Sequence, residues 1–269
     1  MNKRIPILLF VCISFLAAGD SPSLITLLPE KKIVLPFAAS GTEHRISYNK
    51  QMTRGSFIGS MGGVFPVADV RYNDLLCQVS AASSLYTTLQ NAGIKFKVTD
   101  VNFYVDIFFD IPVTSEIILR TGWGHTSHHL ADDAMFPGVT AVNYARDYYQ
   151  LFALHRIAAM SGFVYGGLQW TYSFLINRNV GRKILPEFGG EGTIARLFGT
   201  VVMYGAVDLK FRGELAYGST QSYQLGLKSQ NENLRSVRLA YTYRTGLEER
   251  GQFYNQRNVF HTVGIMFDF

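Results

Sequence analysis

The chain has 269 residues, of which 48% are hydrophobic, 14% aromatic and 17% charged. The charged fraction lies below the roughly one quarter of an ordinary soluble domain, whereas the apolar fraction excludes a disordered chain. Two cysteines exclude a disulfide scaffold, and a net charge of +5 without a basic run disfavours nucleic acid as a partner. Length alone allows one or two soluble domains or one membrane barrel.

The N-terminus, residues 1–19, has the pattern of a secretory signal peptide. Two basic residues precede an apolar run at 5–16, and small residues follow at 17–19. The run is shorter than the ~20 residues of a spanning helix, and no stop-transfer pattern follows, which disfavours an N-terminal anchor. We therefore predict export, with residues 20–42 as a short lead segment in the periplasm.

The remaining chain alternates between apolar and polar residues with a period of two. The alternation is clear at 101–110, 201–212, 215–228 and 238–244. Successive side chains of a strand point to opposite faces, so each of these segments is an amphipathic strand. Strands of around ten residues are longer than the ~5–6 of soluble proteins, and aromatic residues gather near their ends. Both features favour a transmembrane β-barrel over a soluble sandwich.

The chain closes on one more amphipathic strand, residues 260–269. His261, Val263, Ile265, Phe267 and Phe269 share one face of it. This strand resembles the C-terminal signature of bacterial outer-membrane barrels, although the family usually has an aromatic residue at the position of His261. The resemblance implies an outer-membrane location and recognition of Phe269 by the barrel-insertion machinery.

The pattern predicts one domain, an antiparallel transmembrane β-barrel over residues 43–269 with about twelve strands, ten or fourteen remaining open. With both termini in the periplasm, the connections near 87–98, 128–139, 177–182 and 247–255 are extracellular. The lumen is lined by charges of both signs, which predicts ion pairs rather than a wide pore. These lumen residues are Asp106, Asp110, Arg120, Asp208, Lys210, Arg212, Glu214, Arg238 and Arg244. The predicted strands are 43–50, 54–68, 73–86, 99–111, 115–127, 140–157, 162–176, 183–199, 201–212, 214–229, 234–246 and 256–269.

One dense polar cluster, residues 124–133, carries the candidate chemistry. Arg120 belongs in the lumen because arginine on a lipid-facing side is unfavourable, so His125 and Ser127 have the opposite parity and face outward. A histidine and a serine two residues apart on a strand are neighbours on one face, where imidazole can act as base for the hydroxyl. On the next strand, either Asn143 or Asp147 could orient the imidazole.

This H-x-S arrangement resembles two families of outer-membrane lipid hydrolases, phospholipase A and the lipid A deacylase. The resemblance implies that His125 is the general base, Ser127 the nucleophile, and Asn143 or Asp147 the orienting residue. It also implies that the substrate is an acyl ester of an outer-membrane lipid. It covers only the short motif, and both families have asparagine where this chain has His128.

A second resemblance covers nearly the whole mature chain. The matching pieces are similar to bacterial outer-membrane proteins grouped as a domain of unknown function. They are residues 35–39 with Glu43 and Arg45, and residues 125–132, 143–147, 165–167 and 246–254. The family commonly reads H-L-G-D-E, where this chain has alanine and aspartate in place of the glycine and glutamate. That family has no settled activity, so the resemblance implies a fold and a location rather than a reaction.

Other interpretations of the cluster stay open. His128, His129, Asp132 and Asp133 are candidate ligand-binding residues, but their spacing matches no defined metal site and adjacent histidines of a strand point opposite ways. We predict no metal or cofactor, with calcium left open. The cluster could instead be a hydrogen-bond network that orders an extracellular loop. The candidate functions are therefore a lipid-acting serine hydrolase, a non-enzymatic structural or ligand-binding barrel, and a small channel; the oligomeric state is open.

Overall fold

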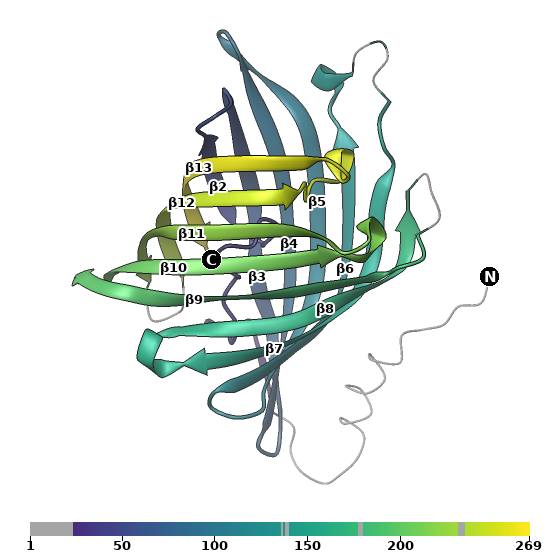
Figure 1. Ribbon diagram of the computed structural model, residues 1–269. Helices are drawn as coiled ribbons and strands as arrows, with labels where there is room; N and C mark the ends of the chain where they lie inside the picture. The colour runs from purple at the N-terminus through teal and green to yellow at the C-terminus, as the bar shows by residue number, and fades with distance from the viewer. Residues whose placement is uncertain (1–23, 136, 138–139, 177–179, 231–234) are drawn as a thin grey trace.

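The computed structural model describes residues 24–135, 137, 140–176, 180–230 and 235–269. In these ranges the chain forms thirteen strands in one antiparallel sheet that closes on itself (Figure 1). No helix there has the length and apolar character to cross a membrane. The strands are β1 (Leu24–Leu27), β2 (Ile46–Gln51), β3 (Ser56–Tyr72), β4 (Leu75–Ala92), β5 (Lys95–Pro112), β6 (Ile117–Leu130), β7 (Tyr144–Ile157), β8 (Gly162–Leu175), β9 (Ile184–Phe198), β10 (Val201–Arg212), β11 (Gly218–Gln230), β12 (Ser236–Leu247) and β13 (Arg257–Asp268).

Twelve of these strands, β2 to β13, form the barrel, which confirms the predicted antiparallel barrel of about twelve strands. Each strand pairs with its neighbours in sequence, and β13 pairs with β2 to close the ring. The extra strand, β1, was not predicted. It pairs with residues 68–71 of β3, on the same edge that β2 uses at residues 57–60. Because β2 has only six residues, it leaves the rest of that edge free for β1.

Apolar side chains of the barrel wall face outward and polar side chains face inward. On β5, Phe103, Val105 and Ile107 are 40–43% exposed, whereas Asn102 and Asp106, at alternate positions of the strand, are at most 5% exposed. A soluble protein buries the first set and exposes the second. The reversed arrangement is the one that a barrel in lipid requires.

The lumen is filled by charged pairs, as predicted. Arg120 donates from Nε and Nη2 to the two carboxylate oxygens of Asp110, at 2.7 and 2.9 Å. Arg238 binds Asp268 with the same two-point geometry, at 2.9 Å for each bond. Two-point arginine–carboxylate bonds hold both groups in a fixed orientation, so they tie neighbouring strands together from the inside. Of the nine predicted lumen residues, seven are buried and two, Glu214 and Arg244, are half-buried.

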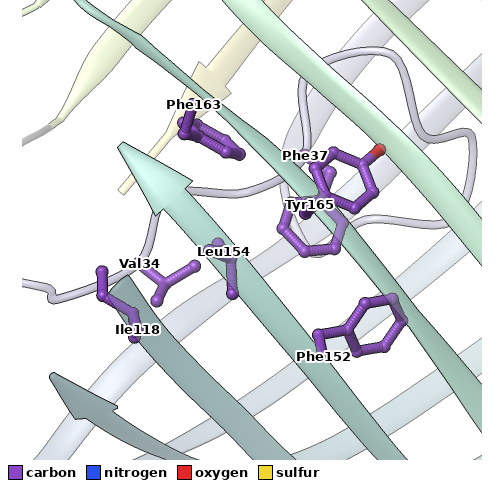
Figure 2. Close-up of a cluster of buried hydrophobic side chains, with 7 residues drawn as sticks. All are labelled: Val34, Phe37, Ile118, Phe152, Leu154, Phe163 and Tyr165. Atoms are coloured by element: carbon purple, nitrogen blue, oxygen red, sulfur yellow. The ribbon is translucent and has the colours of Figure 1, made fainter. Parts of the chain in front are cut away.

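Residues 33–42 of the lead segment lie inside the barrel, not in the periplasm as expected from the sequence. Val34 and Phe37 pack against side chains from β6, β7 and β8 (Figure 2), and the Phe37 ring stacks on Tyr165 with a centroid distance of 3.7 Å. The physical reason is that this part of the inner wall is apolar, so the apolar residues of the segment gain burial there. We call residues 32–45 the plug.

Hydrogen bonds hold the plug on its polar side. Arg45 donates to the carbonyl oxygens of Ala38 and Phe37 at 2.8 and 2.7 Å. Lys210 donates to the hydroxyls of Ser40 and Thr42 at 2.8 and 3.0 Å. Two cavities of about 60 and 50 Å³ lie beside residues 37–45 of the plug. They have room for a few water molecules, which argues against an open pore through the middle of the barrel. At the turn end, a wider recess of about 550 Å³ opens beside Ile33, Val34 and Leu35.

Connections alternate between the two ends of the barrel because the strands are antiparallel. The connections that follow β2, β4, β6, β8, β10 and β12 leave the barrel at the loop end, and the other connections and Phe269 lie at the opposite turn end. All four connections predicted to be extracellular lie at the loop end. The one expected at 87–98 is much shorter, because β4 and β5 extend as a hairpin closed at Gly93, whose φ of +75° suits a tight turn.

Candidate functional site

Strand β6 carries His125 and Ser127 on the outward face of the barrel, as their parity predicted. Inward residues of β6 are buried from Ile118 to His128 at every second position, and both candidate residues lie between them, half-buried. In the register with β7, His125 is directly opposite Asp147 and Ser127 is opposite Ala145. Directly opposite residues of an antiparallel pair have neighbouring side chains, so the register brings Asp147 to His125.

His125 and Asp147 are in hydrogen-bond contact on this outward face. The distance between His125 Nδ1 and Asp147 Oδ1 is 2.6 Å, and the side chains are 38% and 30% exposed. A carboxylate at Nδ1 orients the ring and leaves Nε2 for a second partner. Among the described residues, Ser127 Oγ has no hydrogen-bond partner. Catalytic hydrogen bonds are often long before substrate binds, so this geometry is compatible with a histidine–serine pair.

Asn143, the other residue considered for orienting His125, is placed differently. It precedes the first residue of β7 and is exposed. No hydrogen bond links it to His125 in the part of the chain that the structure describes. Of the two candidates, the structure therefore brings Asp147, and not Asn143, to the imidazole.

A group of aromatic side chains lies next to this pair on the outward face. Trp123 and Tyr149 are opposite each other, one step along the strands from His125 and Asp147, and Trp170 of β8 is opposite Tyr149. Tyr149 stacks on Trp170 and Tyr172 with centroid distances of 6.1 and 5.0 Å, and Trp123 Nε1 donates to the Tyr172 hydroxyl at 2.7 Å. Such residues gather at membrane–water interfaces. We call these four residues the aromatic row.

His128 points into the lumen, on the opposite face from His125. Its Nδ1 lies 2.6 Å from Asn102 Oδ1 and its Nε2 lies 2.7 Å from Thr126 Oγ1. Its backbone carbonyl accepts a bond from Gln252 at 2.8 Å. The lumen-facing position agrees with the strand parity, and these contacts leave His128 hydrogen-bonded within the barrel. Its contacts are those of a residue that holds the 248–256 connection.

The other three predicted binding residues do not converge either. His129 is exposed at the end of β6, with its ring 5.9 Å from that of Phe103. Asp133 accepts a bond from the backbone of Val98 at 3.0 Å, and Asp132 begins a short 3-10 turn. Within the described ranges, no three His, Cys, Asp or Glu side chains are close enough to hold a metal ion. These contacts fit the loop-ordering interpretation of the cluster.

On the lumen side of the site strand β6, Asp106 of β5 links the plug to β7. This carboxylate accepts bonds from His44 of the plug at 2.7 Å, from Tyr148 at 3.1 Å and from Gln150 at 2.8 Å. It lies opposite Gly124, where an added Cβ would come within 2.2 Å of its Oδ1. Glycine at position 124 therefore leaves room for Asp106 to bind His44 of the plug on the lumen side of β6, one residue before the outward-facing His125. The sequence marked Asp106 only as a lumen residue, since nothing in it predicts the contact with His44.

The 248–256 connection folds over the lumen at the loop end and contacts the inner side of β6. Its Gly251 N–H lies 3.0 Å from His128 Nδ1. Burial alone raises the pKa of the Glu249 carboxyl, but Lys210 and Arg244 outweigh burial and lower that pKa from 4.5 to about 2. The Lys210 Nζ to Glu249 Oε1 distance is 2.6 Å, so an ion pair anchors the connection to β10.

Comparison with known proteins bears on the fold. No family model and no curated protein sequence matches the chain, so the resemblance to the family of unknown function stays a prediction. Among solved structures, the outer membrane phospholipase of Salmonella typhi, a dimer with bound calcium, is similar with 14% identity and a TM-score of 0.54 over 88% of this chain and 93% of that one. Outer membrane phospholipase A from Escherichia coli is similar with 14% identity and a TM-score of 0.51 over 89% and 95% of the two chains. At this identity the comparison shows that the chain shares the β-barrel fold of these phospholipases.

Proposed function

We propose that the protein is an outer-membrane hydrolase of lipid acyl esters, with Ser127 as nucleophile, His125 as general base and Asp147 as the orienting residue. One observation carries the proposal: the 2.6 Å contact between His125 and Asp147 on the outward face, with Ser127 two residues further along the same face. A base oriented by a third group beside a hydroxyl is the arrangement of nucleophilic catalysis.

In the proposed reaction, Ser127 Oγ forms a bond to the ester carbonyl carbon while His125 Nε2 takes the hydroxyl proton. The tetrahedral intermediate breaks its bond to the alcohol oxygen, which leaves with that proton. Water then attacks the acyl-serine, gives a proton to His125, and releases a fatty acid and free Ser127. Asp147 remains ionised and stabilises the imidazolium in both halves of the reaction.

The surroundings of the pair suit a lipid substrate. The aromatic row lies next to it, and below that row the outward face is apolar, with Leu119 and Leu151 exposed by 38% and 53%. A lipid whose acyl chains lay on these apolar residues would bring its ester linkages next to the pair. The barrel would reach the outer membrane through its export signal, residues 1–19, which lie outside the described residues. The insertion machinery would recognise the last strand through Phe269.

Calcium deserves a separate test because the Salmonella neighbour contains it. Calcium takes about six to eight oxygen ligands, usually with several carboxylates. In the described part of the chain, Asp147 is the one carboxylate in contact with the reactive pair, and it is engaged with His125. The residues present therefore do not assemble a carboxylate-rich calcium site beside Ser127, and no step of the proposed reaction uses the ion.

The test is fatty-acid release from phospholipid and from lipid A in mixed micelles, with calcium and with a chelator. We expect release by the purified full chain and its loss in Ser127→Ala and His125→Ala. The matched control is Ser173→Ala, since Ser173 is a serine on the same outward face, opposite Asp147 on β8, but has no histidine opposite it. It should retain activity. An inactive wild-type barrel under all conditions, or an active Ser127→Ala variant, would refute the proposal and favour a non-enzymatic barrel.

A further inference from the structure

The barrel wall has a notch at the loop end between β13 and β3. Strand β2 pairs with β13 only over Thr262–Phe267, and the last contact is the Met52 N–H donating to the His261 carbonyl at 2.7 Å. Beyond it, within the described residues, the end of β13 from Arg257 to Phe260 has no strand partner on this side. Its backbone groups there are available to a ligand.

An open groove of about 500 Å³ occupies this notch on the outer surface. Two arginines and a histidine line it, and none of its lining residues is acidic. The lining residues are Thr53, Arg54, Thr245, Gly246, Arg257, Asn258, Val259 and His261. Strands β2, β12 and β13 contain a single acidic residue, Asp268, which is buried at the other end against Arg238. Glu248 of the 248–256 connection accepts a bond from the lining residue Asn258 at 3.3 Å, but Glu248 is 2% exposed and its carboxylate is paired with Arg250 at 2.7 Å. The groove is therefore a locally positive site.

The cationic groups of the groove keep free donors. Arg257 is exposed and makes no hydrogen bond or ion pair within the described ranges. Arg54 uses one nitrogen to hold Asn258 Oδ1 at 3.2 Å, while its guanidinium lies 5.6 Å from the Phe260 ring, so it is held at the groove with its other N–H groups available. When the Tyr241 hydroxyl donates to Nδ1 of His261, at 2.6 Å, the imidazole proton lies on Nε2 as a further donor.

We propose that this groove binds the phosphate group of an anionic lipid in the membrane leaflet at the loop end. Guanidinium groups bind phosphate oxygens in a two-point geometry, and Arg54 with Arg257 offers two of them. A lipid phosphate fits better than a free anion because the same outward face continues into apolar residues. Val263 and Ile265 lie below His261 on β13 and are 40% and 39% exposed. Acyl chains would lie on them when the headgroup occupies the groove.

This site is separate from the proposed reaction. In the ring of strands, β13 and β2 are separated from β6 by β3, β4 and β5. The loop end near β6 carries carboxylates that the groove lacks, among them Asp147, Asp132 and Asp133. The groove therefore serves to hold or orient the barrel among anionic lipids, and its occupation does not depend on whether the protein is a hydrolase.

The test measures lipid binding by the full chain in non-ionic detergent, by native mass spectrometry. All variants carry Ser127→Ala, so that turnover of the probe has no influence. The probes are bisphosphorylated lipid A, the same lipid without phosphates, and inorganic phosphate. We expect preferential retention of the phosphorylated lipid, and retention about tenfold weaker in Arg54→Gln/Arg257→Gln, because two charge-assisted contacts are lost. The control, Lys95→Gln/Lys97→Gln, removes the same charge at the same end and should bind like the parent.

Three results would overturn the inference. The first is equal binding by the arginine variant and its control, which would make the effect one of overall charge. The second is equal retention of the lipid without phosphates. The third is inorganic phosphate binding as tightly as the lipid, which would make the groove a site for free anions. A gel shift between heated and unheated samples shows that each variant is folded, and Arg54→Lys/Arg257→Lys should bind with intermediate strength, since lysine keeps the charge but not the two-point geometry.

Discussion

If the protein is the proposed hydrolase, replacing Asp147 should slow lipid hydrolysis without abolishing it. Asp147→Asn keeps an oxygen that can accept the bond from His125 Nδ1 but removes the negative charge, whereas Asp147→Ala removes both. The charge matters when His125 holds the serine proton, because the imidazolium is then paired with the carboxylate. The asparagine variant therefore isolates the electrostatic part of the contribution.

The magnitude follows from the geometry of the pair. Two unit charges about 4 Å apart attract by ~1 kcal/mol in water and by ~4 kcal/mol at the effective dielectric of a protein surface. With side chains 38% and 30% exposed, the pair lies between these limits. A contribution of about 2 kcal/mol corresponds to a rate reduced by roughly 30-fold in Asp147→Asn. Asp147→Ala also loses the orientation of the ring, so we expect a fall of about 10²-fold or more.

The assay is the initial rate of fatty-acid release at saturating substrate in mixed micelles. Asn143→Ala is the control. Asn143 was the other candidate for orienting His125, but it is exposed and makes no hydrogen bond to His125 in the described part of the chain. It should keep the wild-type rate. The reasoning fails if Asp147→Ala remains within twofold of wild type while Ser127→Ala is inactive, or if the loss occurs in Asn143→Ala instead.

Three further predictions concern the parts that hold the site. Gly251→Ala should loosen the 248–256 connection, because the new Cβ would lie 2.6 Å from His128 Cγ. We expect faster proteolysis of that connection. The control is Gly181→Ala, whose new Cβ would have no atom of the described chain within 4 Å, its two chain neighbours apart, and which should change nothing. In the folded protein the pKa of Glu249 is lowered from 4.5 to about 2. The ionised carboxylate therefore stabilises the folded state by roughly 3 kcal/mol above about pH 4.5, and this stabilisation is lost as the pH falls towards 2. Unfolding by denaturant across that range should show this slope in the wild type and a flatter one in Glu249→Gln. Phe37→Ala should lower the free energy of unfolding by about 3–5 kcal/mol, and an undiminished unfolding midpoint would show that the plug does not stabilise the barrel.

The period-two alternation was enough to predict the barrel because each barrel strand faces lipid on one side and the polar lumen on the other. The outward face of β5 has to be apolar and its inward face polar, so a one-residue shift would turn Asp106 towards lipid. The same parity placed Arg120 in the lumen and His125 and Ser127 outside. The plug and β1 were not predicted from the sequence. Residues 24–45 show no clear hydrophobic periodicity, and no turn signal in them indicates where in the fold they lie. Their place depends on the apolar inner wall near Phe152 and Tyr165.

Thus the sequence by itself determined the fold class, the lumen-facing and outward-facing sets, and the candidate pair His125 and Ser127, since these depend on the order of residues within one strand. The tertiary structure decided between Asn143 and Asp147, because that choice depends on the register between β6 and β7. It also decided that His128 binds the 248–256 connection and that the arginines at 54 and 257 meet at one groove. Residues some 200 positions apart become neighbours only when the barrel closes, and no local pattern encodes that distance.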